Sequence, residues 1–289
     1  DAGELVMLDT WPQVVEFARE HTLVFISHQW LALDEPDPLN AHYPAILDAS
    51  RALCERLSLV EDSVYLWIDY ISIPQACDTV KALSIASLGV YASTVDHFIV
   101  IAPAVRHRDH GGECNTASYQ RRGWCRLEQW ACLAGGAGEH MYICDDESTL
   151  RPVRDQRGWL EDSLRVFDGD FTDEADKYKC VDVVLGLWAM ALRTATTDDD
   201  TESLADGAAE GTPTAALSAA RLVHDLVKPR KDTIFPPEYF MGGRLIAKLE
   251  QLLELELQVV SSPVDRLTRT RRRWRGAGRL FGSGGGGSG

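Results

Sequence analysis

The sequence predicts an α/β protein in which helices flank a doubly wound parallel sheet of about five strands, with a helical extension near the C-terminus. Two observations lead to this prediction. Four short apolar runs are rich in Val, Ile, Tyr and Phe and lack the strict alternation of a half-exposed strand, so they suit a sheet covered on both faces. Helical patterns lie between these runs, and strand–helix alternation at this spacing is typical of a parallel, flavodoxin-like sheet.

The predicted elements follow one another in chain order. The apolar runs LVFIS, VYLWID, HFIVIA and HMYIC predict strands at 23–27, 64–69, 97–102 and 140–144. Amphipathic patterns predict helices at 42–58, 82–93, 124–134 and 179–193. We expect a fifth strand at 164–167 (LRVF), which would complete the sheet.

Changes in composition divide the chain into five parts. Residues 1–193 form the predicted α/β domain. Residues 194–216 lose periodicity and concentrate acidic and small side chains, as a solvated linker does. Amphipathic helices in 217–264 are expected to pack back on the domain, and the alternative is an oligomer contact. An arginine-rich tail (265–281) is followed by a Gly/Ser segment (282–289) with the composition of an engineered linker.

The composition favours a cytoplasmic protein that does not bind nucleic acid. The formal net charge of −15 argues against nucleic-acid binding by the body of the chain. No apolar run approaches the roughly 20 residues needed to span a bilayer, and the first residues lack a signal-peptide pattern. The 7 cysteines are an odd number, and several lie within predicted helices or strands, which favours reduced thiols in an intracellular protein.

The arginine-rich tail has three interpretations, of which nucleic-acid binding is disfavoured by the acidic body of the chain. It can lie against the protein's own acidic surface, because the body of the chain is strongly negative. It can also contact an anionic membrane, where Trp274 and Phe281 would accompany the arginines.

Polar and aromatic side chains follow the first two predicted strands. In open α/β sheets, ligands bind beyond the carboxyl ends of the strands. The residues at these positions are Ser27, His28, Gln29 and Trp30 after the first strand, and Asp69 and Tyr70 after the second. We expect them to line a ligand site, with Trp30 and Tyr70 as stacking surfaces. The alternative is structural: Ser27 and Asp69 would cap the segments that follow their strands, and Trp30 would fill the core. The glycine-rich phosphate loops of Rossmann and P-loop proteins are absent from the sequence, so a dinucleotide would need another binding mode.

One acidic residue, Glu128, lies among the apolar positions of the predicted helix 124–134. A carboxylate that faces a core is costly unless it is paired or has a function. The two interpretations are therefore a buried ion pair, for instance with Arg121 or Arg122, and a functional carboxylate at the ligand site.

His107, His110 and Cys114 lie close together in the polar segment 104–121. Their spacing suits zinc, but no C-x-x-C pair and no second cluster accompanies them. We therefore predict no metal site and interpret the segment as a surface loop that could gate the ligand site.

The motifs VFISH, LWIDYISIPQ, HFIVIAP and GWCRLE occur in this order on successive predicted strands and helices. Over residues 20–145 this order resembles a Toll/interleukin-1 receptor (TIR) domain. The motif LWIDYISIPQ is also similar to the TIR-related heterokaryon-incompatibility (HET) domains of fungi. The pattern W-C-x-x-E at 124–128 is similar to a motif of plant and related TIR domains, whose glutamate is the catalytic residue of NAD⁺ cleavage in the enzymatically active members.

The resemblance implies a TIR-like NAD⁺ hydrolase or cyclase that releases nicotinamide and acts in signalling or immune defence. Glu128 would be the catalytic carboxylate, and no cofactor is implied beyond NAD⁺ as the substrate. The predicted substrate-binding residues are Ser27, His28, Gln29, Trp30, Asp69, Tyr70, Trp124 and Cys125. Trp124 also suits a position in the core. The product, ADP-ribose or a cyclic form, stays open.

The resemblance further implies a homo-oligomer that assembles through TIR-like surfaces, with residues 71–81 as a contact loop. The alternative function is a non-enzymatic interaction module that signals by self-association. In that alternative Glu128 has a structural role.

Overall fold

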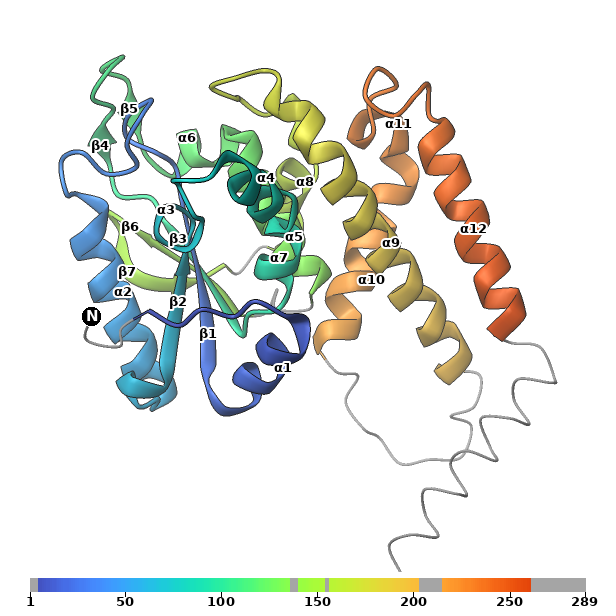
Figure 1. Ribbon diagram of the computed structural model, residues 1–289, viewed down its shortest axis with the longest axis horizontal. Coiled ribbons are helices and arrows are strands. Elements are labelled where there is room, and N and C mark those ends of the chain that lie inside the picture. The colour runs from blue at the N-terminus through green and yellow to red at the C-terminus, as the bar shows by residue number, and fades with distance from the viewer. Residues whose placement is uncertain (1–4, 136–139, 154–155, 203–214, 261–289) are drawn as a thin grey trace, which may run out of the picture.

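A sheet of 5 strands in the order β2-β1-β3-β6-β7 forms the centre of the computed structural model, which describes residues 5–135, 140–153, 156–202 and 215–260 (Figure 1). The strands are β1 (Thr22–His28), β2 (Val64–Ile68), β3 (His97–Ile101), β6 (Met141–Asp145) and β7 (Ser148–Pro152). The first four in this spatial order are parallel, and β7 pairs antiparallel with β6. The predicted fold class is confirmed, namely a flavodoxin-like α/β sheet of about five strands with helices after it.

Both faces of the sheet are covered because successive side chains of each strand point to opposite sides. On one face, Val24 and Ile26 of β1 pack in one cluster with Ile46 of helix α2 (His42–Leu57). On the other face, Phe25 stacks on Phe98 of β3 and belongs to the larger core that includes helix α7 (Gly123–Ala134). The continuous apolar character of the strands thus has the predicted cause.

The remaining elements of the α/β domain connect or cover these strands. They are α1 (Trp11–Glu20), η1 (Glu61–Ser63), α3 (Asp69–Ser72), α4 (Asp78–Ala86), α5 (Leu88–Ser93), β4 (Val105–Arg106), β5 (Glu113–Cys114), α6 (Thr116–Arg121), α8 (Gln156–Ser163), η3 (Val166–Asp168) and α9 (Asp176–Glu202). The helix predicted at 82–93 is thus two helices that meet at Ser87. The segment 104–121, interpreted as a loop, contains the β4–β5 pair and α6.

The prediction of the fifth strand was wrong. Residues 164–167 enter the 3-10 helix η3, and Val166 and Phe167 are buried in the larger core. The fifth strand is instead β7, which follows β6 through a tight turn. Asp145 holds that turn because its Oδ1 accepts hydrogen bonds from the backbone N–H groups of Glu147 and Ser148, at 3.1 and 3.2 Å.

The linker prediction was wrong at its beginning. Helix α9 continues to Glu202, and therefore includes the first part of the segment 194–216. No glycine or proline occurs between 194 and 202, so nothing in the backbone chemistry stops the helix there. Residues 203–214 lie outside the described residues.

The helical extension packs back on the α/β domain, as expected, and shares its core. It comprises α10 (Ala215–Val227), η4 (Lys228–Arg230), α11 (Lys231–Ile234) and α12 (Arg244–Val260). The ring of the buried Trp188 in α9 stacks on the ring of His224, with centroids 5.8 Å apart. The centroid of the Phe235 ring lies 5.9 Å from that of Trp188. Helices α9, α10 and α12 lie side by side next to the sheet domain in Figure 1. The extension is therefore continuous with the larger core.

The predicted arginine-rich tail (265–281) and engineered linker (282–289) lie outside the described residues. Across the part of the chain that the structure describes, no helix has both the length and the apolar character needed to cross a bilayer.

Candidate functional site

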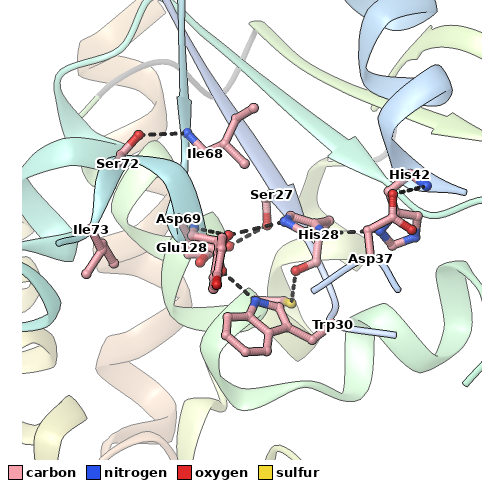
Figure 2. Close-up of polar contacts among 12 residues, drawn as sticks. Ser27, His28, Trp30, Asp37, His42, Ile68, Asp69, Ser72, Ile73 and Glu128 are labelled. Atoms are coloured by element: carbon pink, nitrogen blue, oxygen red, sulfur yellow. Dashed lines mark hydrogen bonds and ion pairs between the residues drawn. The ribbon is translucent and has the colours of Figure 1, made fainter. Parts of the chain in front are cut away.

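The last two side chains of β1 leave the sheet on opposite faces at its carboxyl edge. Ser27 faces helix α7 and contacts Glu128, whereas His28 faces helix α2 and contacts His42 (Figure 2). Because the two point apart, they form no Ser–His pair. The edge of β1 therefore presents two hydrogen-bonded clusters, one on each face, and Asp69 at the end of β2 belongs to the cluster that contains His28.

The α7-side cluster holds Glu128 through a serine. Ser27 Oγ lies 2.5 Å from Glu128 Oε2 and 2.6 Å from the hydroxyl of Tyr119. Glu128 is only 7% exposed, and Ser27 and Tyr119 are fully enclosed. The two arginines that could have paired with Glu128 bind elsewhere, since Arg121 pairs with Asp170 and Arg122 donates to Thr172. Among the described residues, then, Glu128 has no cationic partner and the ion-pair interpretation fails.

Burial raises the pKa of Glu128 to about 8. The hydrogen bond from Ser27 opposes this rise, and the negative charge of Asp69 adds to it. At neutral pH the carboxyl group therefore keeps its proton for most of the time. A positive charge placed next to it would favour the ionised form. Such a group can serve as a proton donor, or as an anion that appears when a cation binds.

The α2-side cluster is built around Asp69 at the end of β2. Asp69 Oδ1 lies 3.2 Å from His28 Nε2 and accepts the Tyr70 backbone N–H at 2.6 Å, while Oδ2 accepts the Trp30 indole N–H at 2.7 Å. Burial raises the pKa of Asp69, but the contacts with His28, Trp30 and Tyr70 outweigh burial and leave the pKa below its ordinary value. Asp69 is therefore an ionised carboxylate at neutral pH.

His42 extends this cluster into the protein. Its Nδ1 lies 3.1 Å from His28 Nδ1, and burial, followed by the proximity of His28, lowers the pKa of His42 to about 3. One of these two facing Nδ1 atoms donates to the other, and which one donates depends on the tautomers of the two rings. His42 Nε2 is buried and has no hydrogen-bond partner within the part of the chain that the structure describes.

The structure brings most of the predicted site residues together. Trp30 and Tyr70 form an edge-on ring pair with centroids 5.9 Å apart, and Tyr70 is 43% exposed. The Cys125 thiol contacts the backbone oxygen of His28 at 3.8 Å. Ser27, His28, Trp30, Asp69 and Glu128 lie close together at one edge of the sheet (Figure 2).

Two predicted residues make their contacts elsewhere. Gln29 donates from its side chain to Ser118 at 2.8 Å and so fastens α6 to the end of β1. Trp124 donates its indole N–H to Asp176 of α9 at 3.1 Å and meets the ring of Phe171. Trp124 therefore faces helix α9, in keeping with the core position that its sequence context also allowed.

Sequence reasoning missed Tyr119 and His42. Tyr119 lies in the segment interpreted as a loop, although Asn115 and Ser118 form a capping box that starts α6 and could have revealed this helix. No comparable signal marks His42. It reaches His28 because Asp37 accepts the backbone N–H groups that begin α2.

The segment 104–121 shows no metal geometry. His107 and His110 stack on each other with ring centroids 3.6 Å apart, and Cys114 is buried in β5. Within the described ranges, no group of at least 3 His, Cys, Asp or Glu side chains is arranged to hold a metal ion.

A surface cavity of about 560 Å³ lies at the opposite edge of the sheet. Its lining includes Arg19, His21, His97 and His140, which lie at or just before the starts of β1, β3 and β6. None of the predicted site residues lines it. The Ser27–Glu128 cluster is therefore distinct from this cavity.

Comparison with known proteins adds no family assignment to this geometry. No protein-family model, no curated protein and no solved structure matches the chain.

Proposed function

We propose that this protein is a TIR-like NAD⁺ hydrolase or cyclase that releases nicotinamide and acts in signalling or defence, with Glu128 as its catalytic carboxylate. One observation carries the proposal: a buried glutamate, with no cationic partner among the described residues, lies at the carboxyl edge of the parallel strands. This is the edge at which open α/β sheets bind ligands. The motif order that resembles TIR domains places its glutamate at the same residue.

The chemistry of NAD⁺ cleavage suits the surroundings of Glu128. The bond between nicotinamide and ribose breaks through an oxocarbenium-like state, and an anion beside the sugar stabilises that state. The nicotinamide ring of the substrate is a cation, so its approach would favour loss of the proton that burial holds on Glu128 at pH 7. The carboxylate would then become charged only when the substrate is in place.

The second cluster supplies the binding groups of the proposed site. Asp69 stays ionised, and three donors fix its orientation. It is a candidate acceptor for a ribose hydroxyl, since a carboxylate can accept about four hydrogen bonds. Trp30 and the exposed Tyr70 provide aromatic faces for a planar ring.

A second candidate function has an observation of its own. Four large apolar side chains on and after α3 are well exposed: Tyr70 at 43%, Ile71 at 60%, Val80 at 42% and Leu83 at 64%. Large apolar side chains that stay exposed along one short segment suit a protein-interaction surface. They favour self-association near residues 71–81, either as a requirement for catalysis or as the whole function of a non-enzymatic module.

Nicotinamide release separates the two functions. Purified protein is incubated with NAD⁺ at several protein concentrations, with the oligomeric state measured in parallel. We expect release by the wild type, loss of at least about 100-fold in Glu128→Gln, and wild-type release by Glu161→Gln, a matched change at a partly exposed glutamate of α8. Assembly without any release would refute the enzymatic proposal and leave the interaction module.

A further inference from the structure

A chain of hydrogen bonds reaches Glu128 from the interior of the protein. It runs from the Tyr119 hydroxyl to Ser27 Oγ over 2.6 Å and from Ser27 Oγ to Glu128 Oε2 over 2.5 Å. Tyr119 has no exposed surface and Ser27 only 1%. The two hydroxyl groups therefore lie behind Glu128, which keeps the small exposed surface of the cluster.

The donors and acceptors of this chain follow from the ionised form of Glu128. A carboxylate only accepts, and Ser27 has a single hydroxyl hydrogen, so Ser27 donates to Oε2. In its other contact Ser27 Oγ must then accept a hydrogen bond from the Tyr119 hydroxyl. Glu128 Oε1 accepts no hydrogen bond from the described residues, so it is the oxygen left for a ligand.

We infer that Ser27 and Tyr119 are positioning residues for Glu128: they hold Oε2, orient Oε1 toward the ligand and favour the ionised carboxylate. This inference rests on the proposed function, because the role belongs to the same reaction. Ser27 would accordingly act on the carboxylate rather than on the substrate, a different role from the ligand contact predicted for it. The hydrogen bond from Ser27 is also the one contact that lowers the pKa of Glu128 against burial.

The two hydroxyl groups should contribute unequally. Ser27 contacts the carboxylate itself, whereas Tyr119 acts only by polarising the Ser27 hydroxyl. Removing the Ser27 hydroxyl therefore removes a charge-assisted hydrogen bond, and removing the Tyr119 hydroxyl weakens it. If the two hydroxyl groups served only packing, the pKa of Glu128 would not rise more on loss of the Ser27 hydroxyl than on loss of the Tyr119 hydroxyl.

The chain offers a matched control on the same helix. Ser163 is fully buried and donates its hydroxyl to Gln129 Oε1 at 2.9 Å, one residue beyond Glu128 on α7. Ser163→Ala therefore removes a buried serine hydroxyl and its hydrogen bond to Gln129 of α7, and leaves the contacts of Glu128 unchanged. Any effect shared by Ser27→Ala and Ser163→Ala reflects loss of packing or stability.

The test combines two measurements on Ser27→Ala, Tyr119→Phe and Ser163→Ala. The first is the titration of the Glu128 carboxyl group, followed by carbon-13 NMR with Glu128→Gln to assign the signal. The second is nicotinamide release as a function of pH. We expect the pKa of Glu128 to rise in Ser27→Ala and, by less, in Tyr119→Phe. Release at pH 7 should fall by about 10- to 100-fold in Ser27→Ala, with its acidic limb moved to higher pH, and Ser163→Ala should match the wild type in both measurements.

The outcomes distinguish this inference from the proposed function. If the titration of Glu128 does not move in either variant while the wild type releases nicotinamide, the positioning role is refuted and the proposed function stands. If the titration moves but the wild type releases no nicotinamide at any concentration, the catalytic role of all three residues is refuted. Should Ser27→Ala fail to fold by circular dichroism, Tyr119→Phe, which removes one oxygen atom, decides the question.

Discussion

Replacing Glu128 by Gln should make the protein more stable at alkaline pH than the wild type. The amide is neutral at every pH and has nearly the shape of the protonated carboxyl group, so it can occupy the same buried position and still accept the Ser27 hydroxyl. The wild-type side chain must instead either hold its proton or carry a charge with only 7% of its surface exposed. The two proteins should therefore differ in how their stability depends on pH.

The size of the difference follows from the two pKa values of Glu128. In the folded state the pKa is about 8, and the ordinary value for the unfolded chain is 4.5. Because the folded value is the higher one, the stabilising effect of the protonated group is fully present below pH 4.5 and is lost as the pH rises to about 8. At about 1.4 kcal/mol per unit, the wild type should lose on the order of 3 kcal/mol between about pH 5 and pH 8 relative to the variant.

Urea denaturation at pH 5, 6, 7 and 8 measures this difference as the free energy of unfolding of each protein. Other groups also titrate in this range, but they are common to both proteins and cancel in the comparison. Glu16→Gln on the exposed side of α1 is the matched control, and its pH dependence should follow that of the wild type. Parallel curves for the wild type and Glu128→Gln would refute the argument, because they would mean that Glu128 titrates alike in the folded and unfolded chains.

Two further predictions concern packing and protonation. Gly123→Ala should destabilise the protein by about 2 kcal/mol, because the new Cβ would lie 2.0 Å from the ring of Phe171. In Gly186→Ala of α9 the new Cβ meets open space, so this variant should be as stable as the wild type or more stable by up to about 1 kcal/mol. The denaturation midpoint of Gly123→Ala should therefore lie below that of Gly186→Ala. Equal midpoints would contradict the packing argument. His42, whose pKa is lowered to about 3 chiefly by burial, should stay neutral between about pH 5 and 8. Nitrogen-15 NMR of the imidazoles tests this prediction, and a titration of His42 near pH 6.5 would refute it.

The sequence was most informative where local pattern and global position agree. Strands covered on both faces need continuous apolar residues, and this requirement placed the four parallel strands correctly. The rule for ligand sites then selected Ser27 and Asp69 from their positions after these strands. The antiparallel strand β7 was not predicted, because its residues 148–152 mix polar and apolar side chains and because its pairing depends on the turn at Asp145. A hairpin of this kind is specified by side-chain to backbone hydrogen bonds, which leave only a weak trace in the sequence.

The partners within the site could not be predicted, for a physical reason. Tyr119 and His42 contact β1 across 92 and 14 residues of chain, and the register of α6 and α2 against the sheet decides these contacts. Helix periodicity gives the face of a side chain but not its neighbour across a tertiary contact. For Glu128 this difference was decisive, because sequence neighbours suggested an arginine whereas the fold supplied Ser27.

The two carboxylates at this edge of the sheet are held in opposite protonation states by their surroundings. Contacts with His28, Trp30 and the Tyr70 backbone overcome burial at Asp69, whereas at Glu128 burial outweighs the single hydrogen bond from Ser27. Neighbouring groups with divergent pKa values are typical of active sites in which they have different roles. Within the proposed function, Asp69 would bind and Glu128 would react. A ligand that brings positive charge to Glu128 would favour its ionised form at neutral pH, so within the proposed function the charge of the nicotinamide ring would be part of what the site recognises.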